Sequence, residues 1–288
     1  MQRALLGCVL IGFTNGCLSS FIVLRRLALM ADALSHSLLP GLAVGVILFG
    51  LAPAGLFFGA LLAALFVAVG AELISRSSRI KEDTSLGILY SVAFSLGLVL
   101  LTFAKVRVEL HHYLFGNILG LANTDLWILY GISLAIVPLL VALQRPFLLM
   151  LFEPTTARTL GVPVAALNYV LIFMLVLSMI SSLQAVGVIL ALGLLTAPAA
   201  TVYLFSDSFV ALFWGGGFLG MFGSCLGLFL SYWLNLPSGA SIVLVLGAFF
   251  CLAYLFSPKY GIAFRLLHRR HFHEESLARW QQRKKKTG

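Results

Sequence analysis

Apolar runs of about 20 residues recur along the chain, and short polar or basic segments separate them. A helix needs about this length to cross the hydrocarbon core of a bilayer, whereas membrane β-strands are shorter and alternate in polarity. The pattern therefore predicts an all-α polytopic membrane protein with nine transmembrane helices, or eight if one span is broken or re-entrant. The predicted spans are residues 4–24, 31–50, 54–74, 85–104, 126–144, 165–184, 186–205, 209–234 and 239–257.

Composition excludes a water-soluble domain. The 288 residues are 61% hydrophobic and 10% charged, with a mean hydropathy of +1.05, whereas soluble proteins average about 25% charged residues. The net charge of +9 is concentrated in the tail after the last span. We therefore expect a transmembrane domain over residues 1–260 and a basic cytoplasmic tail over 261–288, which touches anionic lipid headgroups and binds no nucleic acid.

The other basic residues fall in alternate loops. They lie at residues 25–26, 76–81 and 145–158, and the main exceptions are Lys105 and Arg107. Cytoplasmic loops of membrane proteins are enriched in lysine and arginine. This rule predicts an N-terminus outside the cell and a C-terminus in the cytoplasm.

Asp32 and His36 place a carboxylate and an imidazole four residues apart near the start of the second span. Ionisable groups are expensive inside a bilayer and tend to line a polar path or bind an ion. On a helix the two side chains stack on one face, within joint reach of one cation. A carboxylate with a neutral imidazole suits Mn²⁺, Fe²⁺ or Zn²⁺, and because the imidazole must be neutral, binding should weaken in acid.

Two other classes of protein could use such residues. An intramembrane enzyme is disfavoured, because Ser35 and His36 are neighbours about 100° apart on a helix and cannot form a triad with Asp32. The sequence also lacks the H-E-x-x-H and G-x-S-x-G motifs. An ion-coupled carrier or channel stays open as an alternative. Such a protein would need a relay for protons or sodium ions, and the spans contain few further acidic residues to form one. Glu72 and Asp207 sit near span ends, where the interface can solvate them.

Residues 144–163 do not have the pattern of a span. Glu153 before Pro154 suits the first turn of a helix, and Gly161 can end it in a left-handed conformation before Pro163. We expect a short cytoplasmic helix of about two turns. On its own it is equally well explained as an ordinary interfacial loop helix.

The span 186–205 carries Thr196 and Pro198 at mid-membrane depth. Proline frees a backbone carbonyl, which is tolerated where the backbone lines a cavity or is buried by protein. The segment therefore either lines a pathway or is simply a kinked helix. In the next span, glycines at residues 216, 220, 223 and 227 predict a close helix-packing face.

The remaining histidines and the cysteines carry weaker signals. His111 and His112 lie in a predicted outer loop, where they could meet an arriving metal but fit ordinary surface positions better. The tail histidines belong to a solvated charged segment, and the cysteines lie in apolar segments as small core residues. These are His268, His271 and His273, and Cys8, Cys17, Cys225 and Cys251.

With these motifs placed, nearly the whole chain resembles the permease subunits of the ABC-3 family of manganese, zinc and iron importers. Residues 25–41 resemble the family's R-R-x-x-x-x-G-D-A-x-S-H-A-x-L-P-G run, with Ala31 in place of glycine. Residues 152–161 resemble its D-P-x-x-A-x-x-x-G coupling segment, with Glu153 in place of aspartate. Three further matches lie in the expected order, at residues 80–88, 113–119 and 194–200. Neither departure removes a ligand or a charge.

The resemblance implies a permease of the type II ABC importer kind. It implies a metal site at Asp32 and His36 in the translocation path. Thr196 and Pro198 lie in the matched segment 194–200, and we expect them to line the pathway or its gate. The resemblance also implies an ATPase-coupling segment, in which Glu153, Pro154, Arg158 and Gly161 take part.

The implied partners are a second permease chain, identical or related, two cytoplasmic ABC ATPases and an extracytoplasmic metal-binding protein, at the cell inner membrane. The chain has no G-x-x-x-x-G-K-[ST] motif, so we expect a transport subunit rather than an enzyme. We expect no cofactor of its own, and the divalent metal is its cargo.

Overall fold

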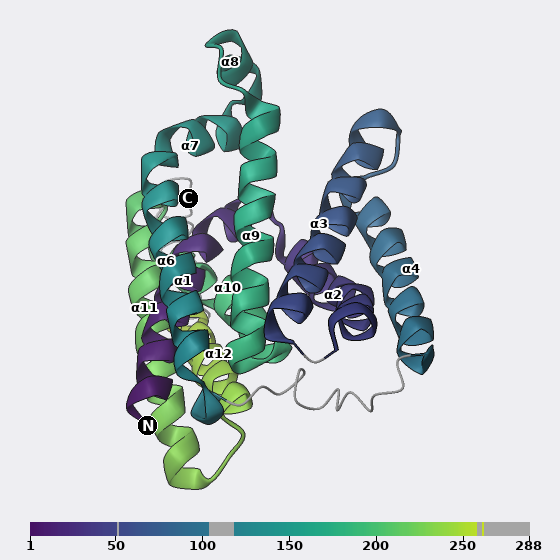
Figure 1. The fold of residues 1–288 in the computed structure, drawn as a ribbon. Helices are drawn as coiled ribbons and strands as arrows, with labels where there is room; N and C mark the ends of the chain where they lie inside the picture. The colour runs from purple at the N-terminus through teal and green to yellow at the C-terminus, as the bar shows by residue number, and fades with distance from the viewer. Residues whose placement is uncertain (51, 104–117, 258–260, 262–288) are drawn as a thin grey trace, which may run out of the picture.

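The computed structural model describes residues 1–50, 52–103, 118–257 and 261. Its elements in chain order are α1 (Gln2–Arg25), α2 (Ala28–Phe49), α3 (Pro53–Ser77), α4 (Glu82–Phe103), the 3-10 turn η1 (Ile118–Gly120), α6 (Asn123–Ala142), α7 (Gln144–Phe152), α8 (Pro154–Thr159), α9 (Val164–Val186), α10 (Val188–Tyr203), α11 (Phe209–Leu234) and α12 (Ser238–Phe256). The described residues are helical with no strand, which confirms the predicted all-α class (Figure 1).

Eight helices in the described part of the chain are long and apolar enough to cross a membrane: α1 to α4, α6, α9, α11 and α12. The remaining predicted span, 186–205, forms only α10, whose 16 residues extend about 24 Å. That is short of the roughly 30 Å hydrocarbon core. Gly187, with φ of +87°, separates α9 from α10, which ends at Tyr203. The structure therefore has the eight-span form of the prediction, with one short helix.

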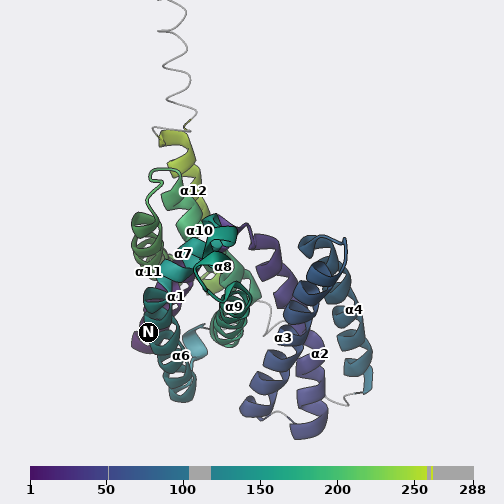
Figure 2. The ribbon, with the colours of Figure 1, turned by 90° about the horizontal axis from the view of Figure 1, so that it is seen from above.

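The helices form two groups that lie side by side (Figure 2). In the larger group, α1 packs against α6, α10 and α11, and α12 covers α10 and α11. In the smaller group, α2 packs against α3 and α4, and α3 contacts α9 of the larger group. The helix that carries Asp32 and His36 thus belongs to the smaller group.

Glycines determine how closely α1 and α11 approach. A Cβ atom added to Gly16 would lie 2.3 Å from the carbonyl oxygen of Gly216, and one added to Gly220 would lie 2.3 Å from that of Gly12. No side chain fits between these backbones. The predicted glycine packing face is confirmed, although Gly223 and Gly227 face Leu246 and Ile242 of α12 rather than α1.

Polar side chains also join the helices inside the apolar bundle. The Asn15 amide of α1 donates to Ser182 Oγ of α9 at 2.8 Å and accepts from Ser178 of the same helix. Such hydrogen bonds join transmembrane helices where lipid offers no partner. They fix α9, the helix that follows α8, against the centre of the bundle.

Candidate functional site

The turn between α1 and α2 determines where the candidate metal residues lie. Arg26 adopts a left-handed conformation with φ of 60°, the Arg26 N–H donates to Val23, and the Leu27 N–H donates to Ile22 at 2.9 Å. This is a Schellman end, in which freed carbonyls of the last helical turn are satisfied. Helix α2 then begins at Ala28, so Asp32 lies in its second turn.

Asp32 and His36 lie one turn apart on α2, as predicted, but they differ in exposure. The Asp32 side chain is exposed on the surface of this single chain, whereas His36 is half-buried. The His36 ring packs between two aromatic residues of α4, with centroid distances of 6.1 Å to Tyr90 and 5.5 Å to Phe94. Ser35 donates to the backbone carbonyl of Asp32 at 2.6 Å and is turned into its own helix.

This pair does not form a complete metal site within one chain. Among the described residues, no group of three or more histidine, cysteine or acidic side chains could hold an ion. Transition metals in proteins usually take about four or more ligands. Helix α4 beside the pair leaves most of its surface uncovered, because only 11% of its most apolar stretch is buried. The geometry therefore provides two donors on an open face.

The predicted coupling segment forms a short helix, as expected. Glu153 precedes α8, Pro154 opens it, and Gly161 adopts φ of +77° after its end. The buried side chain of Ala157 attaches α8 to the protein, and its carbonyl accepts the Val162 N–H at 2.9 Å. In Figure 1, α8 projects beyond the other helices at one end of the bundle. This position leaves Pro154 and Arg158 exposed to a partner.

A polar crevice of about 490 Å³ lies at the base of α8. We call it the arginine crevice. It is lined by side chains from the end of α1 and the turn after it, the end of α3, α7, α8 and the start of α9. Its polar residues are Arg25, Arg26, Glu72, Arg76, Arg158 and Asn168. The basic loops predicted to share one side of the membrane therefore do meet at one end of the bundle.

Two pairs are formed inside the arginine crevice. The Arg76 Nε donates to Glu72 Oε1 at 2.5 Å, and an Arg25 guanidinium nitrogen donates to the side-chain oxygen of Asn168. Glu72 is only 5% exposed. The expectation that the interface solvates Glu72 is therefore wrong: the carboxylate is buried, and an ion pair stabilises it instead.

Helix α10 places Thr196 and Pro198 inside the chain. Pro198 is buried, and the half-buried Thr196 donates its hydroxyl to the Leu192 carbonyl at 2.9 Å. Ala199, which follows Pro198, donates its N–H to Ser19 Oγ of α1 at 3.1 Å. No hydrogen bond among the described residues joins this segment to Asp32 or His36. A role in the pathway stays a prediction.

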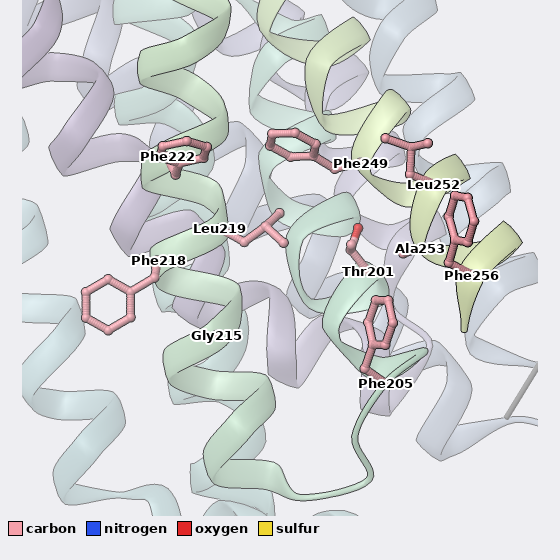
Figure 3. A pocket seen from close by; sticks show the side chains of 10 residues that line it. All are labelled: Thr201, Phe205, Gly215, Phe218, Leu219, Phe222, Phe249, Leu252, Ala253 and Phe256. Atoms are coloured by element: carbon pink, nitrogen blue, oxygen red, sulfur yellow. The ribbon is translucent and has the colours of Figure 1, made fainter. Parts of the chain in front are cut away.

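An apolar pocket of about 610 Å³ lies between α10, α11 and α12, away from these residues (Figure 3). Phenylalanines dominate its wall, and Thr201, its one hydroxyl, donates to the Ala197 carbonyl of its own helix. It offers no metal ligand. Its chemistry suits the acyl chains of a lipid.

Some predictions fall on residues outside those that the structure describes. These are the outer-loop residues His111 and His112, the matched segment 113–117, and the tail with His268, His271 and His273.

The sequence pattern did not single out Asn15 or Asn168 as polar partners. Each is an asparagine within a long apolar run, and that is the signal that could have marked them.

Comparison with known proteins identifies what this arrangement is similar to. Residues 1–257 match the ABC 3 transport family. The "Manganese transport system membrane protein MntC" of Halalkalibacterium halodurans is 38% identical over 266 residues, which cover 92% of this chain and 90% of that protein. A "Probable iron transport system membrane protein" of Haemophilus influenzae is 37% identical over 257 residues, covering 89% of this chain and 93% of that protein. Among solved structures, "PsaBC from Streptococcus pneumoniae in complex with Fab" superposes with a TM-score of 0.80 at 36% identity, covering 93% of this chain and 94% of that one.

Proposed function

This chain belongs to the ABC 3 transport family, and we propose that it is the membrane-spanning permease of an ATP-driven importer of manganese, zinc or ferrous iron. Its eight long apolar helices make it a multi-pass membrane protein. Relatives that are named as manganese or iron transport proteins support a divalent transition metal as cargo. We infer that the membrane is the cell inner membrane, with the C-terminus in the cytoplasm.

The observation that carries the proposal is the pair Asp32 and His36 on α2. The pair lies on a membrane helix, and among the described histidine, cysteine and acidic residues no third one joins it to form a metal-binding group. An exposed carboxylate on a membrane helix has a high free energy in lipid, so this face must meet an ion, water or another protein.

A second permease chain would supply what the pair lacks. The commonest symmetry of homo-oligomers is twofold, in which one surface meets its own copy. Two copies meeting along α2 and α4 would bring two carboxylates and two imidazoles to one axis. Four such donors match the needs of Mn²⁺, Fe²⁺ or Zn²⁺. A closely related permease chain with the same two residues would serve equally well.

The remaining partners would dock at the two ends of the helix bundle. Helix α8, with Glu153, Pro154, Arg158 and Gly161, would dock on a cytoplasmic ABC ATPase, because the chain has no phosphate-binding loop of its own. An extracytoplasmic binding protein would deliver the metal at the opposite end. Closure of the ATPases would push on α8 and change which side of the membrane Asp32 and His36 face, while Thr196 and Pro198 would take part in the pathway.

The test is uptake of isotopically labelled Mn²⁺, Zn²⁺ and Fe²⁺ into vesicles that contain the permease, its ATPase and its binding protein. We expect uptake to need ATP and to be lost in Asp32→Ala. The control is Asp83→Ala, which removes the same charge from an exposed position in the first turn of α4. Uptake without ATP would indicate an ion-coupled carrier instead. ATP-dependent uptake that survives Asp32→Ala would keep the importer and exclude this site.

A further inference from the structure

The arginine crevice contains more positive charge than the chain neutralises. Four guanidinium groups line it together with one carboxylate, that of Glu72, which is paired with Arg76. Arg25 donates to the neutral amide of Asn168, and the half-buried carboxylate of Glu82 on α4 lies near enough to attract it electrostatically, so two carboxylates stand against four guanidinium groups. The side chains of Arg26 and Arg158 make no hydrogen bond or ion pair with any residue that the structure describes. The crevice thus presents unpaired cationic donors.

Asn168 adds a buried donor that also has no partner. Its side chain is 1% exposed, and its Nδ2 makes no hydrogen bond with the described residues. The orientation of the amide is determined by Arg25, because a guanidinium only donates and must therefore face the amide oxygen. The NH₂ group, which is itself buried, is left without an acceptor in the wall of the crevice. A buried donor without an acceptor is unfavourable, so an occupant with oxygen acceptors would stabilise this wall.

Arg26 places a large side chain at a position whose backbone conformation favours glycine. Its φ of 60° lies in the left-handed region, where glycine or asparagine is favoured at the end of a helix. A non-glycine residue in this conformation is a reason to look for function at that position. The guanidinium that Arg26 brings to the crevice provides one.

We propose that the arginine crevice receives an acidic side chain of the ATPase subunit. This inference rests on the proposed function, in which the ATPase docks on α8. Pro154 and Arg158 belong to α8 and also line the crevice, so a protein seated on α8 covers the crevice opening. A carboxylate accepts well from paired guanidinium donors and from an amide N–H. A phospholipid headgroup carries similar charge, but α8 projects away from the membrane spans (Figure 1).

The location gives this contact a role in coupling. Arg25 ends α1, Arg26 begins the turn into α2, and Asp32 follows Arg26 by six residues. An acidic side chain bound there would connect the ATPase directly to the helix that carries the candidate metal residues. The force of ATPase closure would then reach α2 through this contact as well as through α8.

The experiment measures the affinity of the purified ATPase for the permease in nanodiscs of neutral phosphatidylcholine. Arg26→Gly removes the guanidinium and suits the left-handed backbone, so the fold should be retained. Asn168→Asp places a carboxylate inside the crevice, where it competes with the incoming one. The control, Arg145→Ala, removes a charge from an exposed position on α7 that does not line the crevice.

We expect Arg26→Gly to weaken ATPase binding by roughly thirtyfold or more, as for truncation of a buried charge pair, and Asn168→Asp to weaken it as well. Arg145→Ala should change it by less than about threefold. Wild-type ATPase affinity in both crevice variants would overturn this proposal alone. A parallel titration of the same variants with phosphatidylglycerol tests the lipid alternative: a loss of phosphatidylglycerol binding with ATPase affinity unchanged would assign the crevice to a lipid headgroup. A wild-type chain that binds no ATPase would overturn the proposed function as well.

Discussion

The imidazole of His36 on α2 lies edge-on against the ring of Phe94 on α4, with centroids 5.5 Å apart. Tyr90, one turn earlier on α4, stacks on the same imidazole at 6.1 Å. Two aromatic neighbours restrict the rotation of the ring, which in the proposed metal site would present a nitrogen to the metal. Helix α4 therefore positions a candidate ligand without supplying one.

This contact predicts that Phe94→Leu weakens metal binding while the chain still inserts normally. Edge-to-face aromatic pairs contribute about 0.5–1.5 kcal/mol beyond their buried area, so we expect an affinity loss of roughly two- to tenfold. Calorimetric titration of the purified permease with Mn²⁺ would measure it. Phe103→Leu, at an exposed position on α4, is the matched control. Equal affinities for the two variants would contradict a positioning role for α4.

Acid should weaken metal binding through His36. Protonation occupies the lone pair that the metal needs, so affinity falls as the imidazole becomes charged. The loss should approach roughly tenfold per pH unit for each bound imidazole once the ring is mostly protonated. Titrations over a pH series would compare wild type with His36→Gln. The variant should bind weakly at every pH, and a wild-type affinity that does not change with pH would exclude the imidazole as a ligand.

Gly16→Ala should destabilise the contact between α1 and α11. The added Cβ would lie 2.3 Å from the Gly216 carbonyl oxygen, so the two backbones would have to separate. Overpacking of this kind typically costs about 1–3 kcal/mol. The control Gly247→Ala adds a Cβ on α12 with no atom within 4 Å. Thermal unfolding in detergent should show a lower midpoint only for Gly16→Ala, and equal midpoints would contradict the close approach.

The pair between Glu72 and Arg76 predicts an asymmetry between two substitutions. The Glu72 side chain is 6% exposed and that of Arg76 is 40% exposed. Arg76→Ala leaves a buried carboxylate without its partner, whereas after Glu72→Gln the arginine can turn to water. We expect Arg76→Ala to lose roughly 2 kcal/mol of stability and Glu72→Gln less. Thermal unfolding in detergent tests the order, and the reverse order would contradict it.

Much of the fold could be predicted from the sequence because the bilayer imposes a simple rule on span length. The eight long helices and α8 follow from runs of apolar residues and from the glycines and prolines that end them. The short length of α10 could not be predicted, since the run 186–205 is predominantly apolar throughout, whereas the helix covers only Val188–Tyr203. Composition alone does not distinguish a full span from a short helix buried by its neighbours.

The candidate site could be predicted only in part for a different reason. The spacing of Asp32 and His36 indicates a shared helix face, which depends on local geometry. The arginine crevice joins residues 143 positions apart, as in the bond from Arg25 to Asn168. Such a contact depends on how α1 and α9 pack, and the hydrophobic pattern of either helix contains no information about it.

Gly161→Ala should impair the coupling between ATP hydrolysis and metal uptake. Gly161 has φ of +77° directly after α8, a conformation that alanine adopts at a cost of about 1 kcal/mol or more. The added strain should shift α8 relative to α9 and lower the amount of metal imported per ATP hydrolysed. Gly161→Asn is the matched control, because asparagine tolerates this region better. Reconstituted vesicles give both rates, and an unchanged ratio in Gly161→Ala would mean that the conformation after α8 does not matter for coupling.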